Sequence, residues 1–181
     1  MKKPYIQKIQ KDLSIPWFEQ IEKTVVLPYN SEPQIYYSIK PLDYVTALTH
    51  TTENKFIILK QYRPVVEDYT FELPSGHIED GETPAQAITR ELKEETGCLV
   101  EDVTLLGEII PDTGRLENTL WAFYVNKVKI KTLPDPAENE GIEVYLVSRE
   151  ELFTMILEGH FNHALDLSVI TMAILKQYLS L

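Results

Sequence analysis

The 181-residue sequence predicts an α/β protein from the order of its strand-like and helix-like segments. Seven segments show period-two alternation or enrichment in β-branched and aromatic residues, which is typical of strands. Three further segments carry helix-capping residues or apolar residues at helical spacing. With 44% hydrophobic residues and no repeat, the chain can bury one substantial core, so we expect one main domain.

The expected strands lie on both sides of a central helix. In chain order they cover residues 24–27, 34–40, 44–49, 55–62, 103–110, 119–127 and 142–147. Two later helices are expected at about 148–158, opened by a capping box, and at 163–179. The first two strands belong to an N-terminal stretch that is too small for a core of its own, so it should pair with the main sheet or with a second subunit.

Cap residues mark the central helix. Thr83 can serve as its N-cap, with Gln86 completing a capping box and Pro84 at the first helical position. Gly97 can end the helix because glycine readily adopts the left-handed conformation. The sequence therefore predicts a helix that begins just after residue 83 and ends just before residue 97.

Three glutamates of this helix, Glu91, Glu94 and Glu95, fall at positions that a helix brings to one side. Like charges three or four residues apart cost roughly 0.2–0.5 kcal/mol per pair. A bound cation such as Mg²⁺ would turn this repulsion into attraction, because carboxylate oxygens are hard ligands. The alternative is a solvated face, to which Arg90 and Lys93 also belong.

The segment around these glutamates has a specific spacing. Residues 76–98 read GHIEDGETPAQAITRELKEETGC, and the fixed positions are Gly76, Glu82, Arg90-Glu91-Leu92, Glu94-Glu95 and Gly97. This spacing resembles the box of Nudix hydrolases, with Cys98 as the one departure where that family usually has an aliphatic residue. Cysteine buries as a small hydrophobe, so the packing role can survive. The resemblance implies a Nudix-type α/β/α sandwich with a mixed sheet over 43–181, preceded by a small N-terminal β extension over 1–42.

The resemblance also implies a metal cofactor, Mg²⁺ or alternatively Mn²⁺, bound beside the box. Glu91 and Glu95 match the main metal ligands, with Glu94 supporting them. Ser75 matches a position whose carbonyl often ligates metal in related enzymes. Arg90 matches a residue that orients a glutamate, so we expect Arg90 and Glu94 to contribute to catalysis as well.

Two flanking stretches narrow the family. Residues 61–76, QYRPVVEDYTFELPSG, and 136–164, PAENEGIEVYLVSREELFTMILEGHFNHA, resemble ADP-ribose and other nucleoside-diphosphate-sugar pyrophosphatases. The reaction that this implies is Mg²⁺-dependent hydrolysis of a diphosphate bond, most simply that of ADP-ribose to give AMP and ribose 5-phosphate. The alternatives are another nucleoside diphosphate derivative as substrate and a non-catalytic Nudix-fold sensor, which the intact glutamates disfavour.

Four residues are candidates for contacting the substrate. In that subgroup Arg63 would contact a phosphate and Glu72 would lie near the base or sugar; the alternatives are a surface salt bridge and an edge-strand charge. Trp17 is a candidate for stacking on the base, with core or interface packing as the alternative. Glu117 lies where the subgroup carries a loop that helps to choose the substrate.

The general base is expected from the acidic loop DPAENEG, residues 135–141. Related enzymes take a base or a further metal ligand from this loop, and its proline and glycine leave it mobile enough to close over substrate. We expect Glu138 to act as the base and Glu140 to assist it. A merely solvated acidic loop is the alternative.

Charge and composition indicate which classes of binding partner to expect. A formal charge of −11 at pH 7 with no basic run argues against nucleic-acid binding. No apolar run could span a membrane and no signal-peptide pattern follows the N-terminal lysines, so we expect no membrane partner and a cytoplasmic location. One cysteine excludes an intramolecular disulfide. The N-terminal extension is expected to form a homodimer, because its strands and aromatic residues lack a core of their own.

Overall fold

The computed structural model describes residues 5–12 and 18–180. The chain divides into two compact units. The first takes residues up to 43 together with 110–119, and the second takes 44–109 together with 120 onward. The helices of the described ranges are too short or too polar for any of them to cross a membrane.

Three antiparallel strands, in the order β1-β2-β3, form the sheet of the first unit: β1 (Tyr5–Asp12), β2 (Phe18–Leu27) and β3 (Asn30–Pro41). The segment 110–119 joins this sheet at Ile39, whose N–H donates to the Arg115 carbonyl at 2.8 Å and whose carbonyl accepts from the Glu117 N–H at 2.9 Å. The Glu117 carboxylate also pairs with Lys23 and Ser38. These contacts explain why 110–119 groups with the N-terminal strands.

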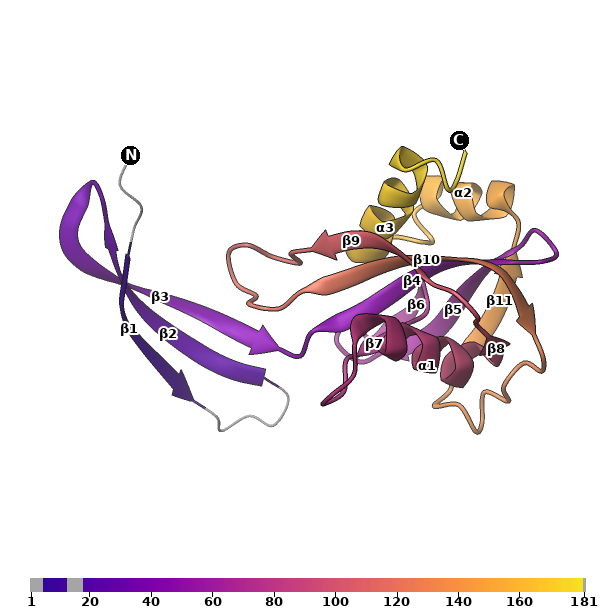
Figure 1. Ribbon diagram of the computed structural model, residues 1–181, viewed down its shortest axis with the longest axis horizontal. Coiled ribbons are helices and arrows are strands. Elements are labelled where there is room, and N and C mark those ends of the chain that lie inside the picture. Colours follow the sequence, from indigo (N-terminus) through magenta and orange to yellow (C-terminus); the bar gives the residue numbers. More distant parts are fainter. Residues whose placement is uncertain (1–4, 13–17, 181) are drawn as a thin grey trace. The chain divides into compact units, whose positions relative to one another are not determined.

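A mixed sheet of eight strands forms the centre of the second unit (Figure 1). Its strands are β4 (Tyr44–Thr51), β5 (Phe56–Arg63), β6 (Asp68–Glu72), β7 (Ser75–His77), β8 (Cys98–Leu99), β9 (Thr104–Ile109), β10 (Leu120–Ile130) and β11 (Glu143–Val147). The main path runs β11-β5-β4-β10-β8, with β6 paired to β5, β7 to β4 and β9 to β10. β4 and β10 are parallel, and the other pairs are antiparallel.

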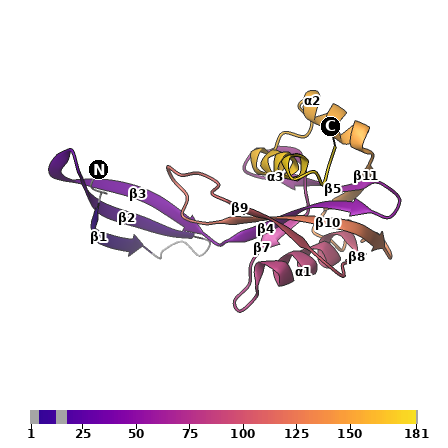
Figure 2. The same ribbon diagram turned by 45° about the horizontal axis from the view of Figure 1, so that its top comes forward.

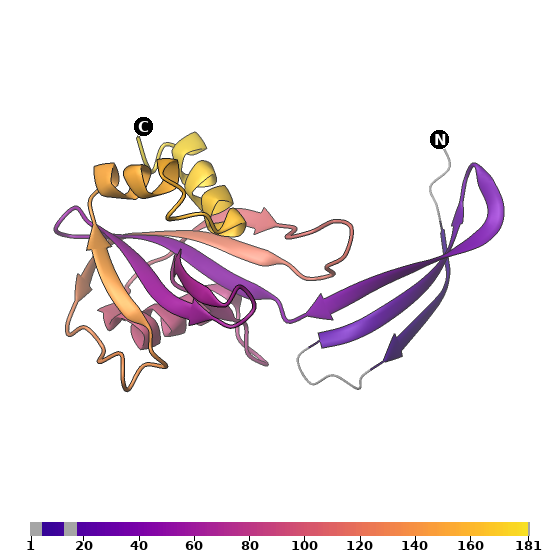
Figure 3. The ribbon, with the colours of Figure 1, turned by 180° about the vertical axis from the view of Figure 1, so that it is seen from behind.

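Helices cover both faces of this sheet. α1 (Pro84–Thr96) lies on one face, and α2 (Arg149–Leu157) and α3 (Ala164–Leu175) lie on the other (Figures 1 and 2). The view from behind shows α2 and α3 on their common face (Figure 3). Because strand side chains alternate between faces, Val45 and Ala47 of β4 pack in the core with Leu92 of α1, while Leu48 packs in the other core with Leu152 of α2. The expected α/β/α sandwich is confirmed.

The cap residues define α1 as expected. Thr83 Oγ1 accepts from the Gln86 N–H at 3.3 Å, and the Gln86 side chain accepts from the Thr83 N–H at 2.8 Å. Gly97 ends the helix with φ at +69° and donates its N–H to the Lys93 carbonyl. Ile88 is fully buried on the inner face, and burial of such a side chain contributes roughly 1.5–3 kcal/mol. Caps and packing together hold the helix that carries the glutamates.

Several elements differ from the sequence expectation. β6, β7 and β8 were not expected, because runs of five, three and two residues are too short to show alternation. β1 was also missed, since its sequence YIQKIQKD is largely polar. The last helix, expected over 163–179, ends at Leu175, because Gln177 adopts a left-handed φ of +64° that a helix cannot continue.

Candidate active site

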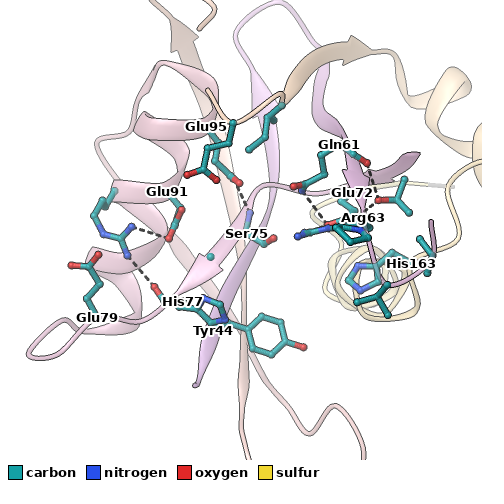
Figure 4. A pocket seen from close by; sticks show the side chains of 18 residues that line it. Tyr44, Gln61, Arg63, Glu72, Ser75, His77, Glu79, Glu91, Glu95 and His163 are labelled. Carbon is teal, nitrogen blue, oxygen red and sulfur yellow. Dashed lines mark hydrogen bonds and ion pairs between the residues drawn. The ribbon is translucent and has the colours of Figure 1, made fainter. Parts of the chain in front are cut away.

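A cavity of about 750 Å³ opens in the second unit, lined by residues from β4 to β7, from α1, and from the start of α3 (Figure 4). Sites for small molecules usually have volumes of roughly 300–1,000 Å³. Five glutamates and two arginines line the cavity, so acidic groups exceed basic ones by three. An anionic ligand would need additional positive charge to bind here.

Glu91 and Glu95 of α1 form one wall of this cavity (Figure 4). Glu95 is buried, and its Oε2 accepts a hydrogen bond from the Ser75 N–H at 3.0 Å. Burial raises the pKa of Glu95 to about 8; the Ser75 hydrogen bond opposes this rise and the Glu91 charge adds to it. Burial likewise raises the pKa of Glu91. Two neighbouring carboxylates that are both costly to ionise are well suited to a cation.

Arg90 connects α1, by several hydrogen bonds, to the segment that precedes it. Its Nε donates to Glu82 Oε1 at 2.9 Å, its Nη1 to Glu91 Oε1 at 2.8 Å, and its Nη2 to the His77 carbonyl at 2.9 Å. The hydrogen bond to Glu82, followed by the one to Glu91, raises the pKa of Arg90, which therefore stays charged. Glu94 also reaches Arg90, but its side chain is 60% exposed, against 14% for Glu91. Glu94 is not among the residues that line the cavity.

The donor atoms on this wall fit a hard divalent cation. A Cβ atom at Gly76 would overlap the Glu91 carboxylate, so the glycine keeps open the space in which this carboxylate lies. Within the described ranges, no three acidic, histidine or cysteine side chains lie close enough to hold an ion by themselves. Glu91 and Glu95 would therefore share the ion with water and substrate oxygens, which is how Mg²⁺ commonly binds.

An arginine–glutamate pair lies across the cavity from α1 (Figure 4). Arg63 of β5 donates from Nε to Glu72 Oε1 at 2.8 Å and from Nη2 to Glu72 Oε2 at 2.5 Å. Thr70 donates to the same carboxylate at 2.5 Å. Burial raises the pKa of Glu72, but the hydrogen bonds from Arg63 and Thr70 outweigh it, so the net shift is downward. Glu72 thus stays ionised and holds Arg63 against the cavity.

The structure adds residues that the sequence did not indicate. His163 and Tyr44 line the cavity. Behind them Asp166, only 2% exposed, accepts from the Leu73 N–H at 2.8 Å, and its Oδ2 lies 2.9 Å from His163 Nδ1. Burial raises the pKa of Tyr44 to about 12, and Asp166 adds to the rise. The spacing of His163 and Asp166, three residues apart at a helix start, is the one sequence signal that could have indicated this pair.

The other expected site residues lie in different places. Glu140 lines the cavity, whereas Glu138 is exposed and does not. Asn139, between them, ties the loop to α1 by donating to a backbone carbonyl of that helix at 3.1 Å. Glu117 belongs to the first unit and pairs there with its neighbours. Trp17 lies outside the described residues.

Comparison with known proteins points to one family. The NUDIX domain model matches residues 40–165. The chain is 32% identical over 118 residues to a protein of Mus musculus named ADP-sugar pyrophosphatase, and the match covers 62% of this chain and 54% of that protein. It is 29% identical over 113 residues to a Bacillus subtilis protein named ADP-ribose pyrophosphatase, with 62% and 61% covered. It is 40% identical over 115 residues to a Bacillus methanolicus protein named methanol dehydrogenase activator, with 63% and 62% covered.

A solved structure titled "Crystal structure of ADP compounds hydrolase" has the same fold. The TM-score is 0.82 at 19% sequence identity, and the match covers 98% of this chain and 95% of the other. Such a likeness shows the fold alone. The chain spans 54% to 62% of the length of the curated relatives named above. Because the family model covers more than half of the chain, including the helix whose carboxylates line the cavity, the chain belongs to the Nudix family.

Proposed function

We propose that the protein hydrolyses the diphosphate bond of a nucleoside diphosphate sugar, with ADP-ribose as the substrate that gives AMP and ribose 5-phosphate. The observation that carries this proposal is the cavity itself, in which the buried Glu95 and the half-buried Glu91 face Arg63 across a volume of about 750 Å³. That volume suits a ligand with a nucleoside and a sugar rather than a small anion. The relatives named ADP-sugar pyrophosphatase and ADP-ribose pyrophosphatase support the same substrate class.

We further propose Mg²⁺ as the cofactor, with Mn²⁺ as an alternative. Glu91 and Glu95 would hold it, together with the Ser75 carbonyl, and Arg90 orients Glu91. When bound, the ion offsets the negative charge of the diphosphate and lowers the pKa of a water molecule. This role agrees with the excess of acidic groups in the cavity, which would otherwise repel the substrate.

The chain's own residues provide positioning and proton transfer. Arg63, which Glu72 holds by two hydrogen bonds, would donate to a phosphate oxygen. A water molecule attacks one phosphorus, its proton passes to a carboxylate, and the bond from that phosphorus to the bridging oxygen breaks, so that both products leave as phosphate monoesters. Glu140 is the loop carboxylate that lines the cavity, so we assign it the base in place of Glu138, which would assist when the loop closes.

The deciding experiment is a product assay. The purified protein would be incubated in Mg²⁺ with a panel of nucleoside diphosphate sugars, dinucleotides and nucleoside triphosphates, and the products separated by chromatography. We expect ADP-ribose or a close relative to have the highest kcat/KM. Faster turnover of a triphosphate than of every diphosphate sugar would show that the substrate class is wrong. Omission of metal, with a chelator present, should abolish turnover.

A second candidate is a role in which the ligand is bound and a partner protein is regulated. The observation that favours it is the 40% identity to the relative named methanol dehydrogenase activator, which is higher than the identity to either pyrophosphatase reported above. The same panel separates the two candidates. Tight binding of a diphosphate sugar without its turnover would favour the regulatory role, whereas turnover at an ordinary enzymatic rate favours the hydrolase.

We also propose a homodimer and a cytoplasmic location. The first unit exposes the apolar side chains Ile35, Tyr37 and Ile39, which alternate along β3 and so share a face. Contiguous apolar surface of this kind is typical of an interface.

The single cysteine, Cys98, is buried and free, which suits a reducing compartment. Cell fractionation with an antibody to the protein tests the location.

A further inference from the structure

A histidine lines the cavity on the side away from the acidic wall of α1. His163 stands at the N-cap position of α3, and its ring lies near Arg63 and Glu72 across the cavity from Glu91 (Figure 4). Its side chain is 42% exposed, so a ligand can reach it. The ring is therefore in a position to contact a bound molecule.

A buried carboxylate fixes the orientation of this ring. His163 Nδ1 lies 2.9 Å from Oδ2 of Asp166, and the two groups attract each other as an ion pair when the ring is protonated. Asp166 is itself held in place, because the same oxygen accepts from the Leu73 N–H at 2.8 Å. Nδ1 thus faces Asp166, while among the described residues no hydrogen bond is made to Nε2. The Nε2 atom, which Asp166 does not contact, can therefore donate to a ligand.

The charges on this side of the cavity leave a place for a cation. Arg63 is matched by Glu72, which contacts two of its nitrogens, so the pair is formally neutral. Arg90, the other arginine of the lining, is engaged by glutamates on α1. No lysine of the described chain lines the cavity. A protonated His163 has its own carboxylate partner, Asp166, but that contact is made at Nδ1 and leaves the Nε2–H for a ligand.

We propose that His163, oriented by Asp166, is a substrate-binding residue that donates from Nε2 to an anionic oxygen of the diphosphate substrate, on the side of the cavity across from Glu91 and Glu95. This inference rests on the proposed function and adds a second contact to that of Arg63. A charge-assisted hydrogen bond of this kind is stronger than a neutral one. Its loss should weaken binding while leaving the chemical step largely intact.

The contact should depend on pH. The groups that face His163 are Asp166 on α3, Glu72 on β6, Arg63 on β5 and, through Asp166, Tyr44 on β4. The contact with Asp166 raises the pKa of His163, while burial and Arg63 oppose the rise. The imidazolium is therefore populated at slightly acid pH and lost at alkaline pH. Substrate should bind more tightly below the pKa of His163 than above it.

Binding of a non-hydrolysable analogue tests the proposal without turnover. The probe is α,β-methylene ADP-ribose, with its affinity measured by calorimetry in Mg²⁺ at pH 6.5 and pH 9. We expect His163→Gln to weaken binding about ten-fold at pH 6.5 and less than two-fold at pH 9. His163→Lys keeps the charge, so it should bind within about three-fold of the parent at pH 6.5 and more tightly than the parent at pH 9.

The matched control is His160→Gln. His160 is a nearby histidine whose side chain is 64% exposed, lies 3.5 Å from Glu158 and does not line the cavity. It should leave affinity unchanged at both pH values. The parent protein supplies a further measurement that needs no variant to fold: the His163 ring resonance should titrate above an ordinary histidine and should shift when the analogue is added.

The outcomes separate this proposal from the proposed function. If the parent hydrolyses diphosphate sugars while His163→Gln keeps parent affinity at pH 6.5, His163 is not a substrate contact and the hydrolase assignment stands. If affinity depends on His163 as described but the parent turns over no diphosphate sugar, the contact stands and the hydrolase assignment is wrong. A ring resonance that does not respond to the analogue would also overturn the contact.

Discussion

Two buried carboxylates of the cavity, Glu95 and Glu72, have pKa values displaced in opposite directions. Glu95 has one backbone donor, Ser75, and its burial and the Glu91 charge prevail, so its pKa rises to about 8. Glu72 accepts from Arg63 and Thr70, and these donors outweigh burial. The donors and the sign of the neighbouring charge together decide the direction. Glu72 is thereby committed to an arginine, whereas Glu95, our proposed metal ligand, has no cationic partner in hydrogen-bonding contact.

Glu95→Gln should abolish activity without unfolding the protein. In the absence of metal, the free energy of unfolding of the variant at pH 7 should equal that of the parent or exceed it by on the order of 1 kcal/mol. The reason is that an acid that is costly to ionise is replaced by an amide whose oxygen can still accept from the Ser75 N–H. Turnover of ADP-ribose should fall by about three orders of magnitude or more, because a metal ligand is lost.

The matched control for this variant is Glu94→Gln. Since Glu94 does not line the cavity, the same change there should cost far less activity. Steady-state kinetics and urea unfolding in a chelator measure both effects. Near-parent turnover by Glu95→Gln would show that the metal assignment is wrong.

Glu72→Gln should lower stability in a pH-dependent way. Because the folded pKa of Glu72 lies below its unfolded value, its contribution is fully present above the unfolded pKa, near 4.5, and is lost as pH falls through the folded pKa. We expect the free energy of unfolding to fall by about 1–2 kcal/mol at pH 7, a loss that is limited because Arg63 is partly exposed to solvent. This loss should approach zero in acid. Urea unfolding from pH 7 to pH 3 measures it.

The comparison for Glu72→Gln is Glu101→Gln, a change at an exposed glutamate. That variant should show little effect at any pH. A loss at Glu72→Gln that persists undiminished in acid would mean that packing, and not the charge, holds the Arg63 pair.

At the scale of the element, α1 is the part on which the site depends. Its capping box sets where the helix begins, and Gly97 sets where it ends. Between these ends Ile88 and Leu92 anchor it to the sheet, so that Glu91 faces the cavity while Glu94 faces solvent. A change in either end would alter the position of the carboxylates relative to β7.

Gly97→Ala should destabilise the protein more than the same change at Gly81. Both glycines have positive φ, +69° and +85°, which costs a residue with a Cβ about 1–2 kcal/mol. At Gly97 the added Cβ would also overlap the Thr132 carbonyl, whereas at Gly81 it meets no atom within 4 Å. We expect a loss of roughly 2–4 kcal/mol against about 1 kcal/mol, measured by urea unfolding. Equal losses would show that the backbone near Thr132 moves aside freely.

At the scale of the whole molecule, the chain combines a strongly acidic composition with two compact units. The formal charge is −11, yet the apolar side chains of β3 in the first unit remain exposed. Burial of these side chains against a second copy of the chain would favour association, whereas repulsion between two negatively charged copies would oppose it. Assembly should therefore strengthen as ionic strength rises.

Light scattering at about 0.15 M salt should give twice the chain mass. Tyr37→Glu places a charge among the exposed apolar residues of β3 and should convert the protein to a monomer. Tyr29→Glu, at the exposed turn between β2 and β3, serves as the control and should leave the mass unchanged. A parent that is a fully active monomer at micromolar concentration would contradict the dimer.

Local signals account for the parts of the fold that could be predicted. Thr83, Gln86 and Gly97 act on their immediate neighbours, so the limits of α1 follow from a short stretch of sequence. The strands that were found are those long enough to show a pattern, such as β4 and β10. β6 and β7 were missed because pairing with longer strands, rather than their own sequence, makes them strands.

The sequence by itself determined the family resemblance and the helix with its glutamates, because these depend on spacing along the chain, and the mixed sheet was expected from that resemblance. Only the tertiary structure decided which glutamates share the cavity, and it joined Asp166 to Leu73 across 93 residues. It also showed that Glu140 lines the cavity and that Glu138, two residues away in the same loop, does not. The physical reason is that burial and charge partners are set by distances in space, and residues far apart in a sequence carry no local sign of becoming neighbours.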